Sequence, residues 1–178
     1  MSAWEAAVAP LLAPRVVAFD PSIAATGVAL ADGTVETIKY PKGVKDDRRL
    51  NVILERTLEV AVGADYAVLE LLPQHMKAAG ITGMAQGAVR IGLNIAEVPY
   101  ASLSPGTVKK FATGKGNADK PDMRMALYQR AGLDLKDDNQ VDAWWLRALA
   151  LHWLGHPVVQ LPKSHLAWVD QADLGWPR

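Results

Sequence analysis

Three carboxylates occupy positions from which one metal site could be built. Asp20 and Glu70 each follow a short apolar run typical of a buried strand, and Asp142 lies in the first turns of a largely apolar helical stretch. Acids at the ends of two strands and on a helix packed against them can converge at one point. Carboxylates that close repel one another and need a cation, and hard oxygen ligands suit Mg²⁺ or Mn²⁺. Two such ions about 4 Å apart can activate water and stabilise the leaving oxygen in phosphodiester hydrolysis.

Each acid also has a purely structural interpretation. Asp20 precedes Pro21 and could start a turn, Glu70 could be a solvated strand end, and Asp142 could favour a helix N-terminus through the dipole. Taken singly, these interpretations are at least as common as metal ligation. Taken together, the three positions favour a metal site.

Two further residues could supply a fourth metal ligand. Asp138 and Asn139 precede Asp142 by four and three residues, so both can share its helix face. Asp138 is chemically the better ligand because it brings charge. Helix capping is the alternative for at least one of the two.

A basic segment at 107–120 is the second chemical signal. It combines lysines with small residues that let backbone amides approach phosphate. The candidate phosphate contacts are Lys109, Lys110, Lys115, Lys120 and, one turn further, Arg124. The segment lacks both the Gly-Lys-Ser/Thr ending of a P-loop and the glycine spacing of a dinucleotide fingerprint. A solvated charged loop is the alternative interpretation.

These side chains need a sheet and helices to position them. Apolar runs and turn residues predict strands at 15–19, 28–31, 35–40, 67–69 and 99–103. Helical spacing and caps predict helices at 46–62, 84–96, 121–132 and 138–154, and a further helix that begins after the Ser104-Pro105 cap. Loops are expected at 80–83 and 113–120. Strands first, then strands alternating with helices, predict an α/β fold: a mixed five-stranded sheet with helices on both faces.

Length and composition narrow the class of protein. A chain of 178 residues that is half apolar indicates one domain with a sizeable core, which we place at 15–155 between an N-terminal appendage at 1–14 and an irregular C-terminal extension at 156–178. Since the sequence has no cysteine, it has no disulfide or thiolate site. No apolar run is long enough to cross a membrane, and a cytoplasmic protein is expected. Its 19 basic and 19 acidic residues balance, so the total charge does not steer the protein toward nucleic acid, and any DNA affinity would have to come from local clusters.

With these residues assembled, the chain resembles the RuvC family of Holliday junction resolvases over about residues 15–155. Four segments carry the resemblance: FDPSIAATG at 19–27, VLE at 68–70, SPGTVKK with TGKGNADK at 104–110 and 113–120, and NQVDA at 139–143. The resemblance implies a ribonuclease H-like fold and a homodimer that contacts its copy through the small-residue helix 84–96. It also implies a crossover junction endodeoxyribonuclease that makes paired nicks in two like-polarity strands of a four-way junction.

The resemblance assigns roles to individual residues. Asp20, Glu70 and Asp142 match the family's acidic ligands of two Mg²⁺ ions, for which Mn²⁺ can substitute. Lys109 and Lys120 match lysines near the scissile phosphate, with Lys120 in a catalytic role.

The chain also departs from the family pattern. Asn139 stands where members usually carry Asp or His, so the second metal ion depends on whether Asp138 takes over. The segment 71–76 replaces a stretch that often holds an aromatic wedge. These departures suggest a divergent member acting in a bacterial cell or, if phage-encoded, in an infected host.

Other functions stay open at this point. One is a catalytically weakened scaffold that binds branched DNA, and another is a nuclease acting mainly on flaps and forks. A sugar kinase or actin-like ATPase is disfavoured because Pro21-Ser22 replaces the early Asp-x-Gly phosphate loop, and because the chain is too short for paired domains.

Overall fold

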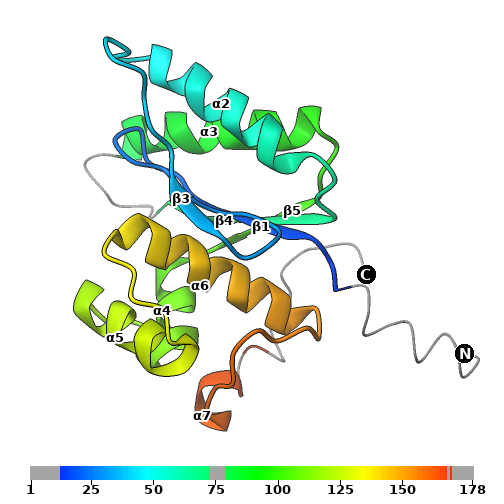
Figure 1. The fold of residues 1–178 in the computed structure, drawn as a ribbon, viewed down its shortest axis with the longest axis vertical. Coiled ribbons are helices and arrows are strands. Elements are labelled where there is room, and N and C mark those ends of the chain that lie inside the picture. Colours follow the sequence, from blue (N-terminus) through cyan, green and yellow to red (C-terminus); the bar gives the residue numbers. More distant parts are fainter. Residues whose placement is uncertain (1–12, 73–78, 168, 170–178) are drawn as a thin grey trace, which may run out of the picture.

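The structure is a computed structural model that describes residues 13–72, 79–167 and 169. A mixed sheet of five strands, in the order β3-β2-β1-β4-β5, forms its centre (Figure 1). The strands are β1 Val16–Asp20, β2 Gly27–Ala29, β3 Val35–Thr37, β4 Tyr66–Glu70 and β5 Tyr100–Leu103. The first three strands are antiparallel neighbours, whereas β4 runs parallel to β1 and β5 runs parallel to β4.

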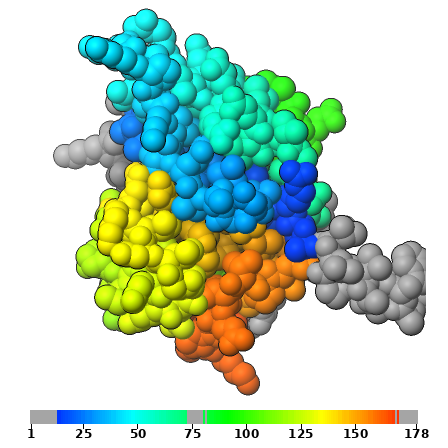
Figure 2. Space-filling view, viewed as in Figure 1, coloured from blue at the N-terminus to red at the C-terminus, as the bar shows by residue number. Residues whose placement is uncertain are grey.

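Helices cover both faces of this sheet, as Figure 1 shows. They are α2 Arg48–Ala61, α3 Ala79–Ile95, α4 Pro105–Thr113, α5 Lys120–Ala131, α6 Asp138–Trp153 and the short α7 Lys163–Leu166. The pair α2 and α3 lies on one face, and α4, α5 and α6 lie on the other. In Figure 2 the blue β2–β3 hairpin forms a band between cyan α2 and the yellow segment around residue 135. The predicted α/β architecture is therefore confirmed.

The alternation of side chains along β1 divides the core in two. Val17 and Phe19 join the cluster under α2 and α3, whereas Val16 and Ala18 join the cluster under α6. The second cluster is built around Trp145, which is fully buried on α6. Its indole nitrogen donates a hydrogen bond to the Met123 carbonyl oxygen at 3.2 Å, which ties α6 to α5.

Small residues on α3 serve a contact within the chain. A Cβ at Gly92 would come within 2.8 Å of Thr57 Cγ2, so the missing side chain lets α3 approach α2 closely. The predicted loop at 80–83 was wrong, because α3 already begins at Ala79. Helix α3 therefore begins closer in sequence to β4 than the loop predicted from Gly80 and Gly83 would allow.

The basic segment 107–120 is helical in its first half. The Ser104 side chain accepts a hydrogen bond from the Thr107 amide, and Pro105 opens the helix, so α4 carries Lys109 and Lys110 on a regular backbone. Gly114 ends the helix with φ of 82°. Only the residues between α4 and α5 form a loop.

The described part of the C-terminal extension, residues 156–167 and 169, contains the helix α7 where an irregular segment was predicted. Helix α7 packs against α4, and its His165 side chain is buried. Its Nδ1 donates a hydrogen bond to the Phe111 carbonyl oxygen at 3.2 Å, while Val169 is fully buried against the α6 side of the core. The extension thus supports the end of α4. No helix in residues 13–72, 79–167 and 169 has the length and apolar content needed to cross a membrane.

Candidate active site

The ends of β1 and β4 place the first two carboxylates side by side. The parallel register pairs Phe19 with Leu69, so Asp20 and Glu70 are the next residues on neighbouring strands. By alternation both continue the face of Ala18, which is the face that α6 covers. Local strand geometry alone therefore directs both acids toward the helix that carries Asp142.

Gly27 allows α6 to come close enough to complete the group. It pairs with Asp20 across β1 and β2. A Cβ at Gly27 would overlap the backbone carbonyl group of Asn139 in the first turn of α6. Only glycine fits between this helix and the sheet at that point.

Asp137 fixes where α6 begins. Its Oδ1 accepts a hydrogen bond from the Asn139 amide at 2.9 Å, which caps the helix, and its Oδ2 accepts one from Thr37 Oγ1 at 2.6 Å. The cap thus also ties α6 to β3. An aspartate directly before a helix is a typical N-cap and can be recognised in the sequence, whereas the predicted capping residue was Asp138 or Asn139.

The three carboxylates line one cavity of about 430 Å³ together with two lysines. Its wall consists of Asp20, Pro21, Ser22, Glu70, Leu71, Leu72, Thr82, Gln86, Pro105, Lys109, Lys120, Met123 and Asp142. Gln86 contributes from α3, and its Nε2 donates a hydrogen bond to the Glu70 carbonyl oxygen at 2.7 Å. Nothing in the sequence signalled this glutamine. The earlier start of α3 adds Thr82, which was predicted to lie in a loop, to the same wall.

The cavity makes it unfavourable for its acids to be ionised. Burial raises the pKa of Asp142 to about 7, and the charge of Asp20 adds to the effect. Burial and the neighbouring carboxylates also raise the pKa of Glu70 strongly, and burial raises that of Asp20. The interaction between the two carboxyl groups adds to the rise in the pKa of Glu70 and partly offsets the rise in the pKa of Asp20, so Glu70 holds its proton more tightly. In the absence of a cation, the group therefore retains protons near neutral pH.

This donor set fits a divalent cation, which would take the place of those protons. Among the described residues, no three acidic or imidazole side chains are grouped closely enough to enclose an ion as they stand. The acids nevertheless share one cavity and one electrostatic field, because the charge of Asp20 acts on both Glu70 and Asp142. Buried carboxylates that repel one another are the oxygen ligands that Mg²⁺ and Mn²⁺ prefer.

Neither candidate for a fourth ligand lines the cavity. Asn139 Nδ2 donates a hydrogen bond to Asp137 Oδ1 at 2.8 Å. Asp138 instead forms ion pairs with Lys120, at 3.0 Å, and with Arg124, at 2.6 Å. Both side chains are thus engaged by neighbours at the start of α6.

The predicted phosphate contacts fall into two groups. Lys109 and Lys120 lie in the cavity wall, where their positive charges face the carboxylates. Lys110 and Lys115 are exposed and lie outside it. Arg124 is turned toward α6, since its Nη2 also donates a hydrogen bond to the Lys136 carbonyl oxygen at 2.6 Å.

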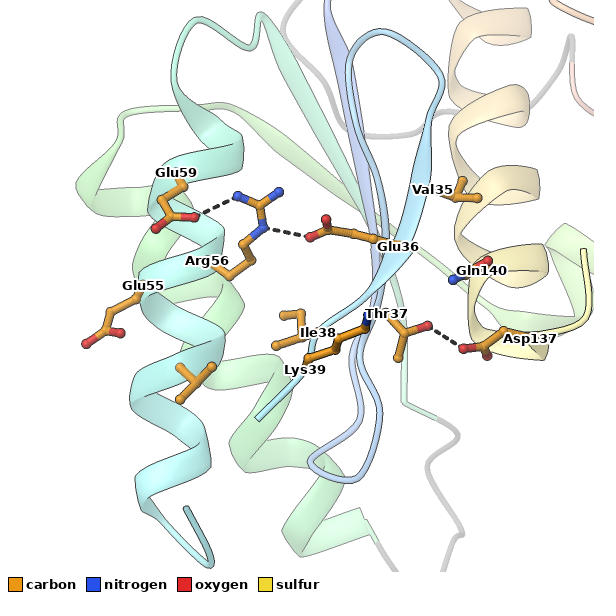
Figure 3. Close-up of a pocket in the computed structure, with 11 residues that line it drawn as sticks. Val35, Glu36, Thr37, Ile38, Lys39, Glu55, Arg56, Glu59, Asp137 and Gln140 are labelled. Carbon is orange, nitrogen blue, oxygen red and sulfur yellow. Dashed lines mark hydrogen bonds and ion pairs between the residues drawn. The ribbon is translucent and has the colours of Figure 1, made fainter. Parts of the chain in front are cut away.

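A larger groove, of about 750 Å³, lies elsewhere, along the open edge of β3 (Figure 3). Its walls come from α2 and from the start of α6, and Arg56 bridges Glu36 and Glu59 across it with contacts of 2.6 Å. None of the three strand-end and helix acids lines this groove. The smaller cavity, which combines these acids with Lys109 and Lys120, is therefore the candidate active site in the described part of the chain.

The strand order and the covering helices define a ribonuclease H-like protein. No model of a protein family matches the chain. It is similar to the crossover junction endodeoxyribonuclease RuvC of Rhodopirellula baltica, with 27% identity over 176 residues that cover 92% of this chain and 94% of that protein. The RuvC of Carboxydothermus hydrogenoformans is 26% identical over 143 residues, which cover 72% of this chain and 90% of that protein.

Solved structures show the same likeness. The RuvC structure of Thermus thermophilus matches with a TM-score of 0.62 and 22% identity, over 82% of this chain and 99% of that one. The same protein in complex with a Holliday junction substrate matches with a TM-score of 0.61 and 24% identity, over 82% of this chain and 98% of that one. These matches confirm the ribonuclease H-like fold and the resemblance to the RuvC family.

Proposed function

We propose that the chain is a divalent-metal-dependent, structure-selective DNA endonuclease that resolves Holliday junctions by paired symmetric nicks. One observation carries the proposal: Asp20, Glu70 and Asp142, from three separate elements, line one cavity with Lys109 and Lys120. Support also comes from the relatives, which are named crossover junction endodeoxyribonucleases, and from the solved complex of one RuvC with a Holliday junction.

Each group in the cavity has a role in this proposal. The three carboxylates would hold Mg²⁺, or Mn²⁺ in its place, as two ions. When bound, such ions supply Lewis acidity and stabilise charge at the phosphodiester. Lys109 and Lys120 bind the phosphate at the cavity rim and offset its developing charge. Lys110, Lys115 and Arg124 would contact the backbone of the DNA arms outside the cavity.

A homodimer through α3 completes the proposal. An apolar stripe on this helix is exposed at Met84, Ile91 and Ile95, whose exposed fractions are 41%, 53% and 62%. At Gly87, on the same side, an added Cβ would meet no atom within 4 Å. A second copy could cover this stripe, and two sites related by a two-fold axis would cut a symmetric junction in both strands.

The proposal also divides the chain into one domain and two extensions. We place the nuclease domain at 15–155, with the segments 1–14 and 156–178 as extensions, and the protein in the cytoplasm of a bacterial cell or an infected host. The first of these extensions lies largely outside the described residues.

A branched-DNA-binding scaffold with weakened catalysis is the second candidate. The observation that favours it is the start of α6, where Asn139 bonds to Asp137 and Asp138 is engaged by two basic side chains. A site with three rather than four ligands would hold its second ion weakly.

Cleavage of a synthetic mobile four-way junction, compared with linear duplex, separates these functions. We expect paired nicks on the junction with Mg²⁺, none with EDTA and none on duplex. Asp20→Asn should abolish cleavage and leave junction binding intact, and cutting by this variant at the wild-type rate would refute the site assignment. Tight binding without nicks in Mg²⁺ or Mn²⁺ would favour the scaffold, and N139D would then be the rescue to test.

A further inference from the structure

The contacts of Asp138 are unlike those of a metal ligand. The residue lies in the first turn of α6, and its side chain is 22% exposed. Lys120 Nζ lies 3.0 Å from Oδ2, and Arg124 Nη2 lies 2.6 Å from Oδ1. Each carboxylate oxygen thus already faces a cationic group from α5, the helix beside α6.

We propose that Asp138 is a positioning residue that holds Lys120 at the rim of the catalytic cavity. This inference rests on the proposed nuclease function, because the purpose of the contact is to present the Lys120 ammonium group to a phosphate. It gives the extra acid at the start of α6 a role that differs from completing the metal site.

Lys120 needs such an anchor. Its side chain is 71% exposed, so it could adopt many rotamers, and ordering a lysine side chain in one of them costs conformational entropy. Cations bound to the nearby carboxylates would also repel its ammonium group. A carboxylate that is itself held in place offsets both effects and keeps the lysine in the cavity wall.

Arg124 restrains Asp138 in turn. Its guanidinium group pairs with Oδ1 and donates a hydrogen bond to the Lys136 carbonyl oxygen at 2.6 Å, just before α6. Asp138 is therefore held by the helix backbone, by Arg124 and by Lys120. A carboxylate so engaged can orient a lysine without turning into the cavity.

The test compares Asp138→Asn, Asp138→Glu and a matched control, Asp134→Asn. Asp134 pairs with Lys136 at 2.7 Å in the same region but does not line the cavity. In single-turnover cleavage at saturating junction and Mg²⁺, D138N should be about tenfold slower than wild type, D138E should recover part of the loss, and D134N should be unchanged. Two Mg²⁺ concentrations should stay within about twofold of wild type in D138N. One is the concentration that gives the half-maximal cleavage rate, and the other is the concentration that gives half-maximal thermal stabilisation without DNA.

Two results would overturn the inference. A tenfold or greater rise in either Mg²⁺ concentration in D138N would make Asp138 a metal ligand. A D138N rate equal to that of D134N would show that Lys120 needs no anchor.

A readout without cleavage separates this inference from the proposed function. The NMR signal of the Lys120 ammonium group should report a more mobile side chain in D138N than in wild type, and equal mobility would refute the positioning role. If wild type cuts no branched DNA while this mobility difference is present, the proposed function fails and the contact itself stands.

Discussion

Replacing Asp142 with asparagine should abolish cleavage and stabilise the metal-free protein. Burial raises the pKa of Asp142 from 3.8 to about 7, so the folded state holds a proton that the unfolded state has released. Because the folded pKa is the higher one, stability is greatest below about pH 4 and falls as the pH rises to about 7. Above that pH the folded protein carries the full penalty of a buried, repelled carboxylate.

The magnitude follows from this pKa. The rise from 3.8 to about 7 corresponds to about 4 kcal/mol at 1.36 kcal/mol per pH unit. The cavity is open to water, whose screening leaves about half of this, about 2 kcal/mol. For a chain of this length, that raises the melting temperature of D142N by about 6 °C over wild type in EDTA at pH 8.

Thermal unfolding followed by circular dichroism, in EDTA, tests this reasoning. The advantage of D142N should shrink toward zero as the pH falls below about 4, where the wild-type carboxyl becomes protonated in the unfolded state as well as in the folded state. Mg²⁺ should stabilise wild type more than D142N, and the exposed control D134N should show neither effect. A D142N protein that is less stable than wild type at pH 8, or one whose advantage is the same at every pH, would refute the argument.

Two further predictions concern the close contact at Gly27 and the exposed apolar stripe on α3. Gly27→Ala should lower the free energy of unfolding by more than about 2 kcal/mol and slow cleavage, because the new methyl group meets the Asn139 backbone rather than a movable side chain. Denaturant unfolding measures this loss, and an unchanged denaturant midpoint would contradict it. If the proposed homodimer of 19.2 kDa chains forms through α3, Ile91→Asp should convert it into a monomer and abolish paired nicks. Val62→Asp, which changes a 73% exposed apolar residue outside α3, should leave the mass unchanged. Light scattering after gel filtration checks the masses, and an I91D dimer would place the contact elsewhere.

Local signals in the sequence located the main elements of the site. Asp20 and Glu70 end their strands because an apolar run stops at a charged residue, and this can be read without knowing the fold. The last core helix, expected at 138–154, is α6 at Asp138–Trp153. The resemblance to RuvC then linked these separate segments to one fold, which the comparisons confirm.

Helix-capping residues are the other local signals in the sequence. Ser104 and Pro105 predict the helix start that α4 shows, and Lys109 and Lys110 lie on that helix rather than in a charged loop. Asp137, an aspartate directly before the helix expected at 138–154, is the N-cap of α6. In both places, a short capping pattern determined the backbone more strongly than composition did.

The partners of each charged group depend on tertiary structure. In the sequence, Asp138 and Asp142 are two acids on one helix face; in the fold, Asp142 enters the cavity of Asp20 and Glu70, whereas Asp138 pairs with Lys120 and Arg124. Residue types and helical spacing determined which side chains could act together. The packing of α5 and α6 against the sheet decides which of these side chains share a cavity, which are buried from water and which form ion pairs. The sequence alone does not decide this, because burial and ion pairing arise between segments far apart in the chain.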